Sequence, residues 1–278
     1  MNKGEYRLRL KLWGVRGSTP TPQIENMGYG GNTPCVEVRL PGGEIFVFDA
    51  GTGARKLGRT LLEEAKGAPL DIRIFLTHFH WDHIQGIPFF EPLYDMRNRV
   101  QFLAHSRTGP LREILEGQMT KPYFPVNFEA ATRNRDFCEL GDEGWKHNGL
   151  EIRPFALNHP HGATGYRMEA NGAVVVYATD HEHGNQDCDR GLREVAHGAD
   201  LMIYDSQYTP EEYDQHRGWG HSTWAEALAV AKDAEVKQVV LFHHDPAHSD
   251  ERLGGILEEA QRLWQPTLMA REGWSIDL

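Results

Sequence analysis

The sequence is poor in cysteine and has no long apolar run, and each absence excludes a class of protein. Its three cysteines, Cys35, Cys138 and Cys188, are widely separated and form no CxxC pair. This pattern argues against a disulfide framework and fits reduced thiols in a cytoplasmic protein. No segment approaches the apolar length that spans a bilayer, so we expect no membrane partner. The opening residues alternate between charged and apolar side chains, which predicts a first strand rather than a signal peptide.

Positive charge and linker sequence are also scarce. The chain has 29 Lys and Arg against 40 Asp and Glu, a formal net charge of −11. Such a chain is not expected to hold a nucleic acid through a broad basic surface, although the composition does not exclude a local basic cleft. No tract rich in Pro, Gly or Ser divides the 278 residues, of which 40% are hydrophobic. We therefore predict a single domain over residues 1–278, with residues 88–136 as a covering insertion.

Strand-like and helix-like runs share the chain. Apolar and alternating runs between Gly and Pro residues predict strands at 7–15, 36–40, 44–49, 71–77, 99–105, 150–158, 165–169, 173–179, 201–205 and 239–243. Helical periodicity predicts helices at 54–66, 111–118, 191–197, 223–234 and 250–264. Consecutive strands mixed with helices are typical of an α/β fold in which helices cover the outer faces of the sheets.

The densest chemical signal is the stretch FLTHFHWDHIQG, which starts at Phe75. Three histidines and an aspartate fall within six consecutive positions, directly after an apolar run. Histidine is the commonest metal ligand. Alternation places His78 and His80 on the same side of an extended segment, while Asp82 and His83 fall where a helix would begin. The spacing predicts two metal sites, one for each pair, and a polar turn is the alternative interpretation.

Three further polar residues follow predicted strands. His159 comes after LEIRPFAL, Asp180 after AVVVYAT and His243 after QVVLF. Singly, each fits a residue that ends a strand or begins a loop. Together with the histidine cluster, they predict one site at the edge of a sheet.

These motifs resemble the metallo-β-lactamase superfamily. The segment THFHWDH carries its HxHxDH pattern, and the resemblance extends from FDAGTG at residues 48–53 to FHHDP at residues 242–246. The resemblance implies a four-layer αββα sandwich with a dinuclear metal centre. It also implies a first metal held by His78, His80 and His159, a second held by Asp82, His83 and His243, and a bridging Asp180.

The motif GHST at residues 220–223 narrows the resemblance. With the GYR motif at residues 165–167, it is similar to the phosphodiesterase branch, which includes transfer-RNA 3′-end nucleases and small cyclic phosphodiesterases. This implies catalytic roles for His221 and Asp82. The nucleases insert an RNA-gripping arm between their third histidine and the bridging aspartate. Here two predicted strands and their turn fill that interval, so transfer RNA is not the expected partner.

We therefore expect an enzyme with two divalent metal ions, with zinc first and manganese or iron as alternatives. Its substrate is expected to be a small phosphodiester, cyclic or linear, attacked by a metal-activated hydroxide while His221 donates a proton. The alternative functions are a carboxyl-ester or lactone hydrolase and a non-catalytic metal-binding carrier. The sequence does not decide whether the protein forms a homodimer. The sequence leaves undecided the roles of Asp49, Asp205, His181, His183 and His244. The candidate phosphate contacts are Arg16, Arg107 and Arg167, and the alternative for each is a structural role.

Overall fold

Two β-sheets form the centre of the molecule. The computed structural model describes residues 6–128 and 135–278. The first sheet contains seven strands, in the order β14 (Ser275–Asp277), β1 (Arg9–Gly14), β2 (Cys35–Arg39), β3 (Ile45–Phe48), β4 (Asp71–Leu76), β5 (Arg99–His105) and β6 (Arg135–Leu140). The second also contains seven, in the order β13 (Thr267–Met269), β12 (Val239–Phe242), β11 (Leu201–Asp205), β10 (Ala173–Ala178), β9 (Ala163–Ala170), β8 (Leu150–Leu157) and β7 (Trp145–His147).

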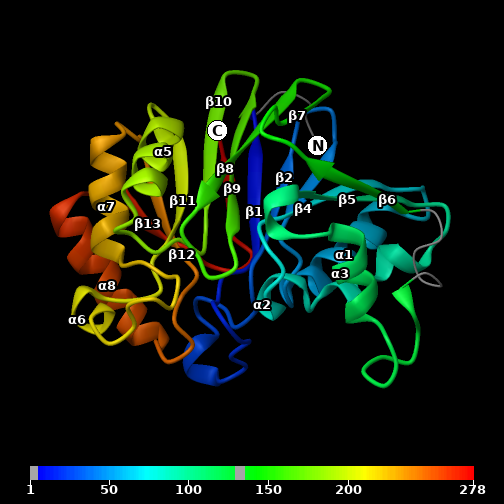
Figure 1. Cartoon of the computed structure of the whole chain (residues 1–278), viewed down its shortest axis with the longest axis horizontal. Helices are drawn as coiled ribbons and strands as arrows, with labels where there is room; N and C mark the ends of the chain where they lie inside the picture. The colour runs from blue at the N-terminus through cyan, green and yellow to red at the C-terminus, as the bar shows by residue number, and fades with distance from the viewer. Residues whose placement is uncertain (1–5, 129–134) are drawn as a thin grey trace.

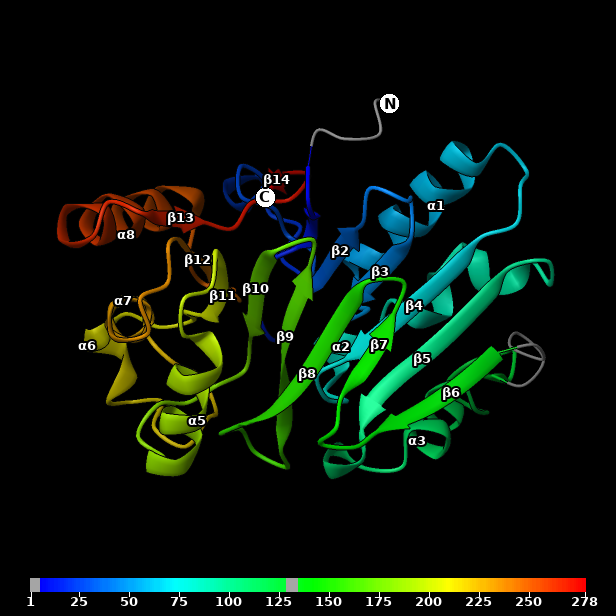
Figure 2. The same ribbon diagram turned by 90° about the horizontal axis from the view of Figure 1, so that it is seen from above.

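Helices cover the outer faces of both sheets, as Figures 1 and 2 show. The first sheet is covered by α1 (Gly53–Ala65) and α3 (Leu111–Gln118), and the second by α5 (Gln186–Ala196), α7 (Trp224–Asp233) and α8 (Asp250–Leu263). Two single-turn helices, α2 (Trp81–Ile84) and α6 (Pro210–Tyr213), lie in the connections. This arrangement confirms the predicted αββα sandwich. No helix among the described residues is both long and apolar enough to cross a membrane.

Side-chain caps explain where the helices on the second sheet begin. The Thr223 hydroxyl accepts the amide N–H of Glu226 at the start of α7, and the Ser249 side chain accepts an amide N–H at the start of α8. Asn185 does the same for α5. Such caps satisfy amides that have no partner inside the helix, and each contributes about 1 kcal/mol.

An apolar core holds the two sheets together. Phe48 pairs with Phe75 across β3 and β4, and their rings stack at 5.1 Å. Tyr166 and Tyr177 of the second sheet pack against Phe48 at 5.6 and 6.0 Å. All four side chains are fully buried. Burial of an aromatic side chain of this size contributes about 1.5–3 kcal/mol, so these contacts hold the inner faces of the two sheets together.

The predicted strands are all present, with boundaries shifted by a few residues. The strands β6, β7, β13 and β14 were not predicted from the sequence. Residues 88–136 do not form a purely covering insertion, because β5 within them pairs with β4 and β6 inside the first sheet. Only parts of this segment, such as α3, cover the sheet, and residues 129–134 lie outside the described residues.

Candidate metal centre

The carboxyl ends of the parallel strands meet at one edge of the sandwich. Strands β3 to β6 run parallel, as do β10 to β13. Asp49 and His243 come directly after β3 and β12, and Asp180 comes two residues after the end of β10. Each of the three has a left-handed backbone, with φ of 59° for Asp49, 58° for Asp180 and 62° for His243. This conformation costs a non-glycine residue about 1–3 kcal/mol and is concentrated at functional sites. Tight turns at the three strand ends therefore direct polar side chains toward a common point.

The first cluster joins His78, His80 and His159. Their ligand atoms all lie within 4.8 Å of one another. The Nε2 atom of His159 is 3.0 Å from Nδ1 of His80, and the buried Nε2 atom of His78 has no hydrogen-bond partner. Burial lowers the pKa of His159 to about 4 and that of His78 well below its ordinary value. Neutral imidazole is the form that ligates metals.

The second cluster joins Asp82, His83, Asp180 and His243, all of them buried. The Nε2 atom of His83 lies 3.1 Å from Asp180 and 3.3 Å from Asp82, and Nε2 of His243 lies 3.2 Å from Asp82. Burial alone lowers the pKa of His83, but the neighbouring carboxylates, chiefly Asp180 and Asp82, raise it well above the ordinary value. The pocket thus favours positive charge at its centre, which is what a divalent cation supplies.

Asp180 stands between the two clusters. Its Oδ1 atom is 3.8 Å from Nε2 of His78 and 3.9 Å from Nε2 of His159. Its Oδ2 atom instead faces His83 at 3.1 Å and His243 at 3.4 Å. One carboxylate therefore presents a different oxygen to each cluster, as a bridging ligand must.

The far nitrogen of three cluster histidines donates to an oxygen. Nδ1 of His83 is 2.9 Å from Asp49, and Nδ1 of His159 is 2.8 Å from the carbonyl oxygen of Gly220. Nδ1 of His243 is 2.9 Å from the Gln207 side-chain oxygen. With each Nδ1–H engaged in this way, each Nε2 atom is aimed at its cluster, the usual arrangement around a metal-ligating histidine. The donor set therefore fits a pair of divalent cations.

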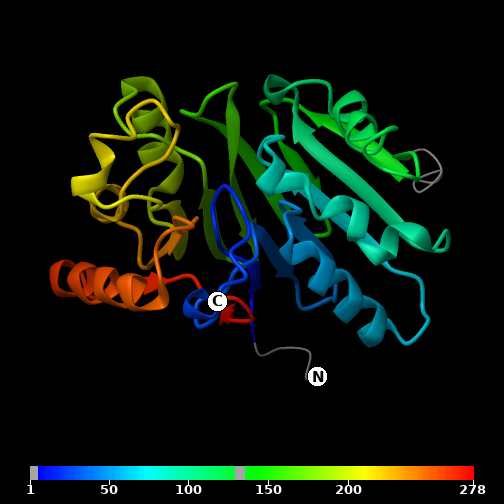
Figure 3. The same cartoon turned by 90° about the horizontal axis from the view of Figure 1, so that it is seen from below.

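Asp49 also ties the centre to both sheets. Its carboxylate accepts the amide N–H of Thr77 at 2.9 Å and the hydroxyl of Tyr177 at 3.0 Å. The undecided role of Asp49 is thereby assigned, because the same carboxylate orients His83. The loop that follows β1, blue and near the centre of Figure 3, also contacts the second cluster. There the amide N–H of Ser18 donates to Asp82 at 2.9 Å.

His221 lies against both clusters and is not a member of the two sets above, although it also groups with His159 and Asp180 and with Asp205 and His243. Its Nδ1 atom donates to Asp205 at 2.8 Å and is 3.9 Å from Asp180, and its ring stacks on that of His243 at 4.9 Å. Burial lowers the pKa of His221, but Asp205 raises it to about 9. A histidine whose Nδ1 is engaged by a carboxylate and which carries a proton suits proton donation better than metal ligation.

The remaining histidines are engaged outside the clusters. His181 accepts the amide N–H of Asn158 and donates to Asp189, and Nε2 of His244 donates to the carbonyl oxygen of Ala270. Nδ1 of His183 lies 2.8 Å from the Ser222 hydroxyl. Among the described residues, none of the groups suited to a metal includes these three histidines.

The three arginines considered as phosphate contacts also have other partners. Arg16 is fully buried and donates to the carbonyl oxygens of Gly30, Asp245 and His248, so it holds the segment after His243 in place. Arg107 pairs with Asp142, and Arg167 pairs with Glu169. All three are structural in this conformation.

Sequence reasoning missed the loop that supports His159. Both oxygens of the buried Glu182 accept amide N–H groups from this loop, Gly218 at 2.7 Å and Gly220 at 2.8 Å.

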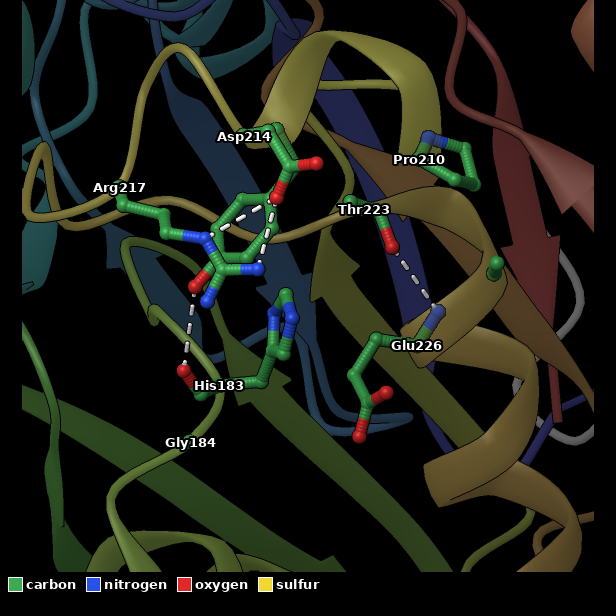
Figure 4. A pocket seen from close by; sticks show the side chains of 9 residues that line it. His183, Gly184, Pro210, Asp214, Arg217, Thr223 and Glu226 are labelled. Carbon is green, nitrogen blue, oxygen red and sulfur yellow. Dashed lines mark hydrogen bonds and ion pairs between the residues drawn. The ribbon is translucent and has the colours of Figure 1, made fainter.

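Beside this loop lies a pocket of about 420 Å³ lined by His183, Tyr213 and Arg217, among others. Figure 4 shows Arg217 pointing to Asp214, with which it is paired. None of the cluster residues lines this pocket, so it is separate from the metal centre.

Comparison with known proteins defines the class. The model of the beta-lactamase superfamily domain matches residues 45–244. The chain belongs to this superfamily, and its fold and clusters define it as a metal-dependent hydrolase that uses divalent metal ions.

Individual relatives place it more closely. The chain is 24% identical to a Ribonuclease Z of Haloferax volcanii over 91% of this chain and 93% of the relative, and 28% identical to one of Thermococcus gammatolerans over 84% and 87%. Among solved structures, a diphosphatase of the PhnP family superposes with a TM-score of 0.71 at 20% identity, covering 98% of this chain and 97% of the other. Zinc-bound PqqB from Methylobacterium extorquens superposes with a TM-score of 0.73 at 15% identity, covering 97% and 100%.

Proposed function

We propose that this protein is a phosphodiesterase that hydrolyses a small phosphodiester at a dinuclear metal centre. The observation that carries the proposal is the His221–Asp205 pair, because it sets a proton donor beside Asp180, where the two clusters meet. Hydrolysis of a phosphodiester needs a cationic surface for the phosphoryl oxygens and a proton for the leaving oxygen. The two clusters and His221 can supply both.

Different residues of the chain would bind the cations, orient the proton donor and donate the proton. Bound divalent cations lower the pKa of water and neutralise phosphoryl oxygens. His78, His80 and His159 would hold one cation, and Asp82, His83 and His243 the other, with Asp180 shared. Asp205 keeps His221 protonated and fixes its ring, so its Nε2–H can donate to the leaving oxygen. Asp82, assigned to catalysis as well as to metal binding, is itself oriented by the Ser18 amide.

We propose zinc as the resident metal. Imidazole nitrogen and carboxylate oxygen are common zinc ligands, although the same donors also accept manganese and iron. The zinc-bound PqqB structure shares the fold. Elemental analysis of protein purified without added metal should find close to two zinc ions per chain.

Three observations favour a small substrate. The interval between His159 and Asp180 is filled by β9 and β10 and their connections, which leaves no room there for an RNA-gripping arm. The alignment with the Haloferax relative extends over 309 positions, more than the 278 residues of this chain, so that relative has residues without counterparts here. The net charge of −11 also disfavours a long polyanion.

RNA is the rival substrate, because the curated relatives are named Ribonuclease Z. The decisive assay compares bis(p-nitrophenyl) phosphate, a 3′-extended transfer-RNA precursor and a panel of lactones on the zinc-loaded protein. We expect hydrolysis of the phosphodiester, at most weak cleavage of the precursor, and none of the lactones. Preferred cleavage of the precursor would establish the rival function. Lactone hydrolysis alone, or two bound metals without any turnover, would overturn the proposal.

We further propose that the chain acts as one domain. The clusters draw on the ends of β4 in the first sheet and of β10 and β12 in the second. Neither sheet alone carries a complete second cluster, so the centre requires both sheets in contact.

A further inference from the structure

Trp219 is an exposed residue of the loop that contacts His159 of the first cluster. Its side chain is 62% exposed, whereas the following residues, Gly220 and His221, are buried. Tryptophan is large and apolar, and leaving most of its surface in water forgoes the gain of burial. Such exposure has an explanation when the ring is kept free for a ligand.

The loop that presents Trp219 is braced on both sides of the residue. The amide N–H groups of Gly218 and Gly220, its two neighbours in sequence, donate to the two oxygens of the buried Glu182 carboxylate at 2.7 and 2.8 Å. The amide N–H of Trp219 itself donates to the carbonyl oxygen of His216 at 3.1 Å. A buried carboxylate is costly unless it is fully hydrogen-bonded, and here its bonds serve to hold this loop. The tryptophan is thus fixed in position although it faces water.

The indole ring is supported from one side by other rings. His216 meets it edge-on at 5.1 Å and stacks on Tyr208 at 4.3 Å. Tyr208 in turn contacts the ring of His221 at 6.1 Å. A chain of aromatic contacts therefore runs from the proton donor of the centre to Trp219.

The loop is also locked to the first metal cluster. The carbonyl oxygen of Gly220 accepts Nδ1–H of His159, so Trp219 precedes a residue in direct contact with a candidate ligand. Trp81, which is 67% exposed, follows His80 of the same cluster. Two exposed tryptophans thus adjoin, in sequence, the residues of one cluster.

We propose that Trp219 is a stacking surface for the base of a nucleotide, so that the phosphodiester cleaved at the centre carries a nucleobase. This inference rests on the proposed phosphodiesterase function and narrows its substrate class. Every nucleobase has a π-face, and stacking on an aromatic side chain needs no specific hydrogen bond. A ring carried on a braced loop that also contacts a candidate ligand gains that stacking energy with little loss of conformational freedom.

The test compares two substrates in three variants. For Trp219→Ala, kcat/KM should fall about 5- to 150-fold more on adenosine 2′,3′-cyclic phosphate than on a cyclic ribose phosphate without a base, the range of one base–aromatic stack. The excess loss should appear in KM. Trp219→Phe should recover most of it, and Leu263→Ala, an equally exposed apolar residue at the end of α8, should change neither substrate. Equal losses on both substrates for Trp219→Ala, or no loss, would overturn the inference.

A binding measurement separates this inference from the function on which it rests. Adenosine monophosphate added to the zinc-loaded protein should quench tryptophan fluorescence, and Trp219→Phe should lose most of that quenching while it retains its metals. If the protein hydrolyses no phosphodiester but Trp219 still reports nucleotide binding, the proposed function fails and the stacking surface stands. Quenching that is identical in wild type and Trp219→Phe would overturn the stacking surface whatever the activity.

Discussion

For individual side chains, the centre depends on hydrogen bonds that fix which nitrogen of each histidine faces the metals. His83, His159 and His243 each give their Nδ1–H to an oxygen, and these oxygens come from a carboxylate, a backbone carbonyl and a side-chain amide. His221 gives its Nδ1–H to Asp205 in the same way. The proposed ligands and the proposed proton donor therefore share the same Nδ1–H···O hydrogen bond. They differ in their Nε2 atoms: those of the ligands face the candidate metal clusters, whereas that of His221 is assigned to proton donation.

Replacing His221 tests whether it acts as the proton donor and not as a metal ligand. His221→Ala should lower kcat on bis(p-nitrophenyl) phosphate by about 10²- to 10⁴-fold, the range for loss of a general acid. Metal content should remain unchanged, because the Nδ1 atom of His221 is bonded to Asp205. Elemental analysis and steady-state kinetics on the same preparation check both statements. Wild-type turnover, or loss of metal together with turnover, would remove His221 from the assigned role.

Sequence reasoning picked out the candidate ligands that lie close together in the chain, and the structure groups them. It missed the residues that support them, which lie far away in the chain. His78, His80, Asp82 and His83 were recognised because their spacing is local. Gln207 and Glu182 have no comparable signal, since each acts on a residue more than thirty positions away. Such partners are brought together only by the packing of the two sheets.

At the scale of strands and loops, the segment from Gly218 to Gly220 holds His159 of the first cluster in position. Both glycines have positive φ, 85° and 89°. A Cβ atom at Gly218 would meet nothing within 4 Å, whereas one at Gly220 would lie 2.2 Å from Nδ1 of His159. The two positions therefore separate backbone strain from displacement of a ligand.

Alanine at each glycine should give different results. Gly218→Ala should cost about 1–2 kcal/mol of unfolding free energy, the penalty of a left-handed non-glycine residue, and should leave the metal content intact. Gly220→Ala should cost more and should weaken metal binding, because His159 must move. Denaturant unfolding and metal titration measure the two effects. Equal metal affinity in the two variants would show that the loop does not position His159.

Asp200 joins the start of β10 to the connection before β12. Its carboxylate accepts the amide N–H of Val174 at 2.8 Å and pairs with Lys237 at 2.7 Å. Burial raises the pKa of Asp200, but the Lys237 and Val174 contacts outweigh it and lower the pKa below the ordinary value. A lowered folded-state pKa stabilises the protein above the unfolded-state pKa, near 4. That stabilisation is lost as the pH falls through the folded-state value.

Asp200→Asn should therefore be less stable than wild type at pH 7. The difference in unfolding free energy should shrink as the pH falls below about 4, the ordinary pKa of an aspartate. Urea unfolding of both proteins across this range gives the curve, provided each refolds reversibly. A difference that is constant or that grows toward acid pH would contradict the assignment.

The short strands show why the sheet order could not be fully predicted. The strands β7, β13 and β14 contain three residues each, too few for an alternating pattern to stand out. β14 adds the last residues of the chain to the edge of the first sheet, next to β1. That pairing joins residues from opposite ends of the sequence and is decided by the fold.

For the entire chain, the metals should act as cross-links between the two sheets. A ligand that binds only the folded state stabilises it by about 2.7 kcal/mol when its free concentration is 100 times Kd. Removal of zinc with a chelator should lower the melting temperature, and added zinc should restore it. Asp180→Ala, which removes the residue between the clusters, should show a much smaller shift. An unchanged melting temperature in wild type would mean that the clusters hold no metal under those conditions.

The position of His243 near the end of the chain sets an order on biosynthesis. The first cluster has all its residues once His159 has left the ribosome, but the second then still lacks His243, which directly follows β12. A nascent chain can therefore gather its first three imidazoles well before the other four ligands assemble. The second cluster is accordingly the later of the two to be complete, and its full set of candidate ligands exists only after His243 has been made.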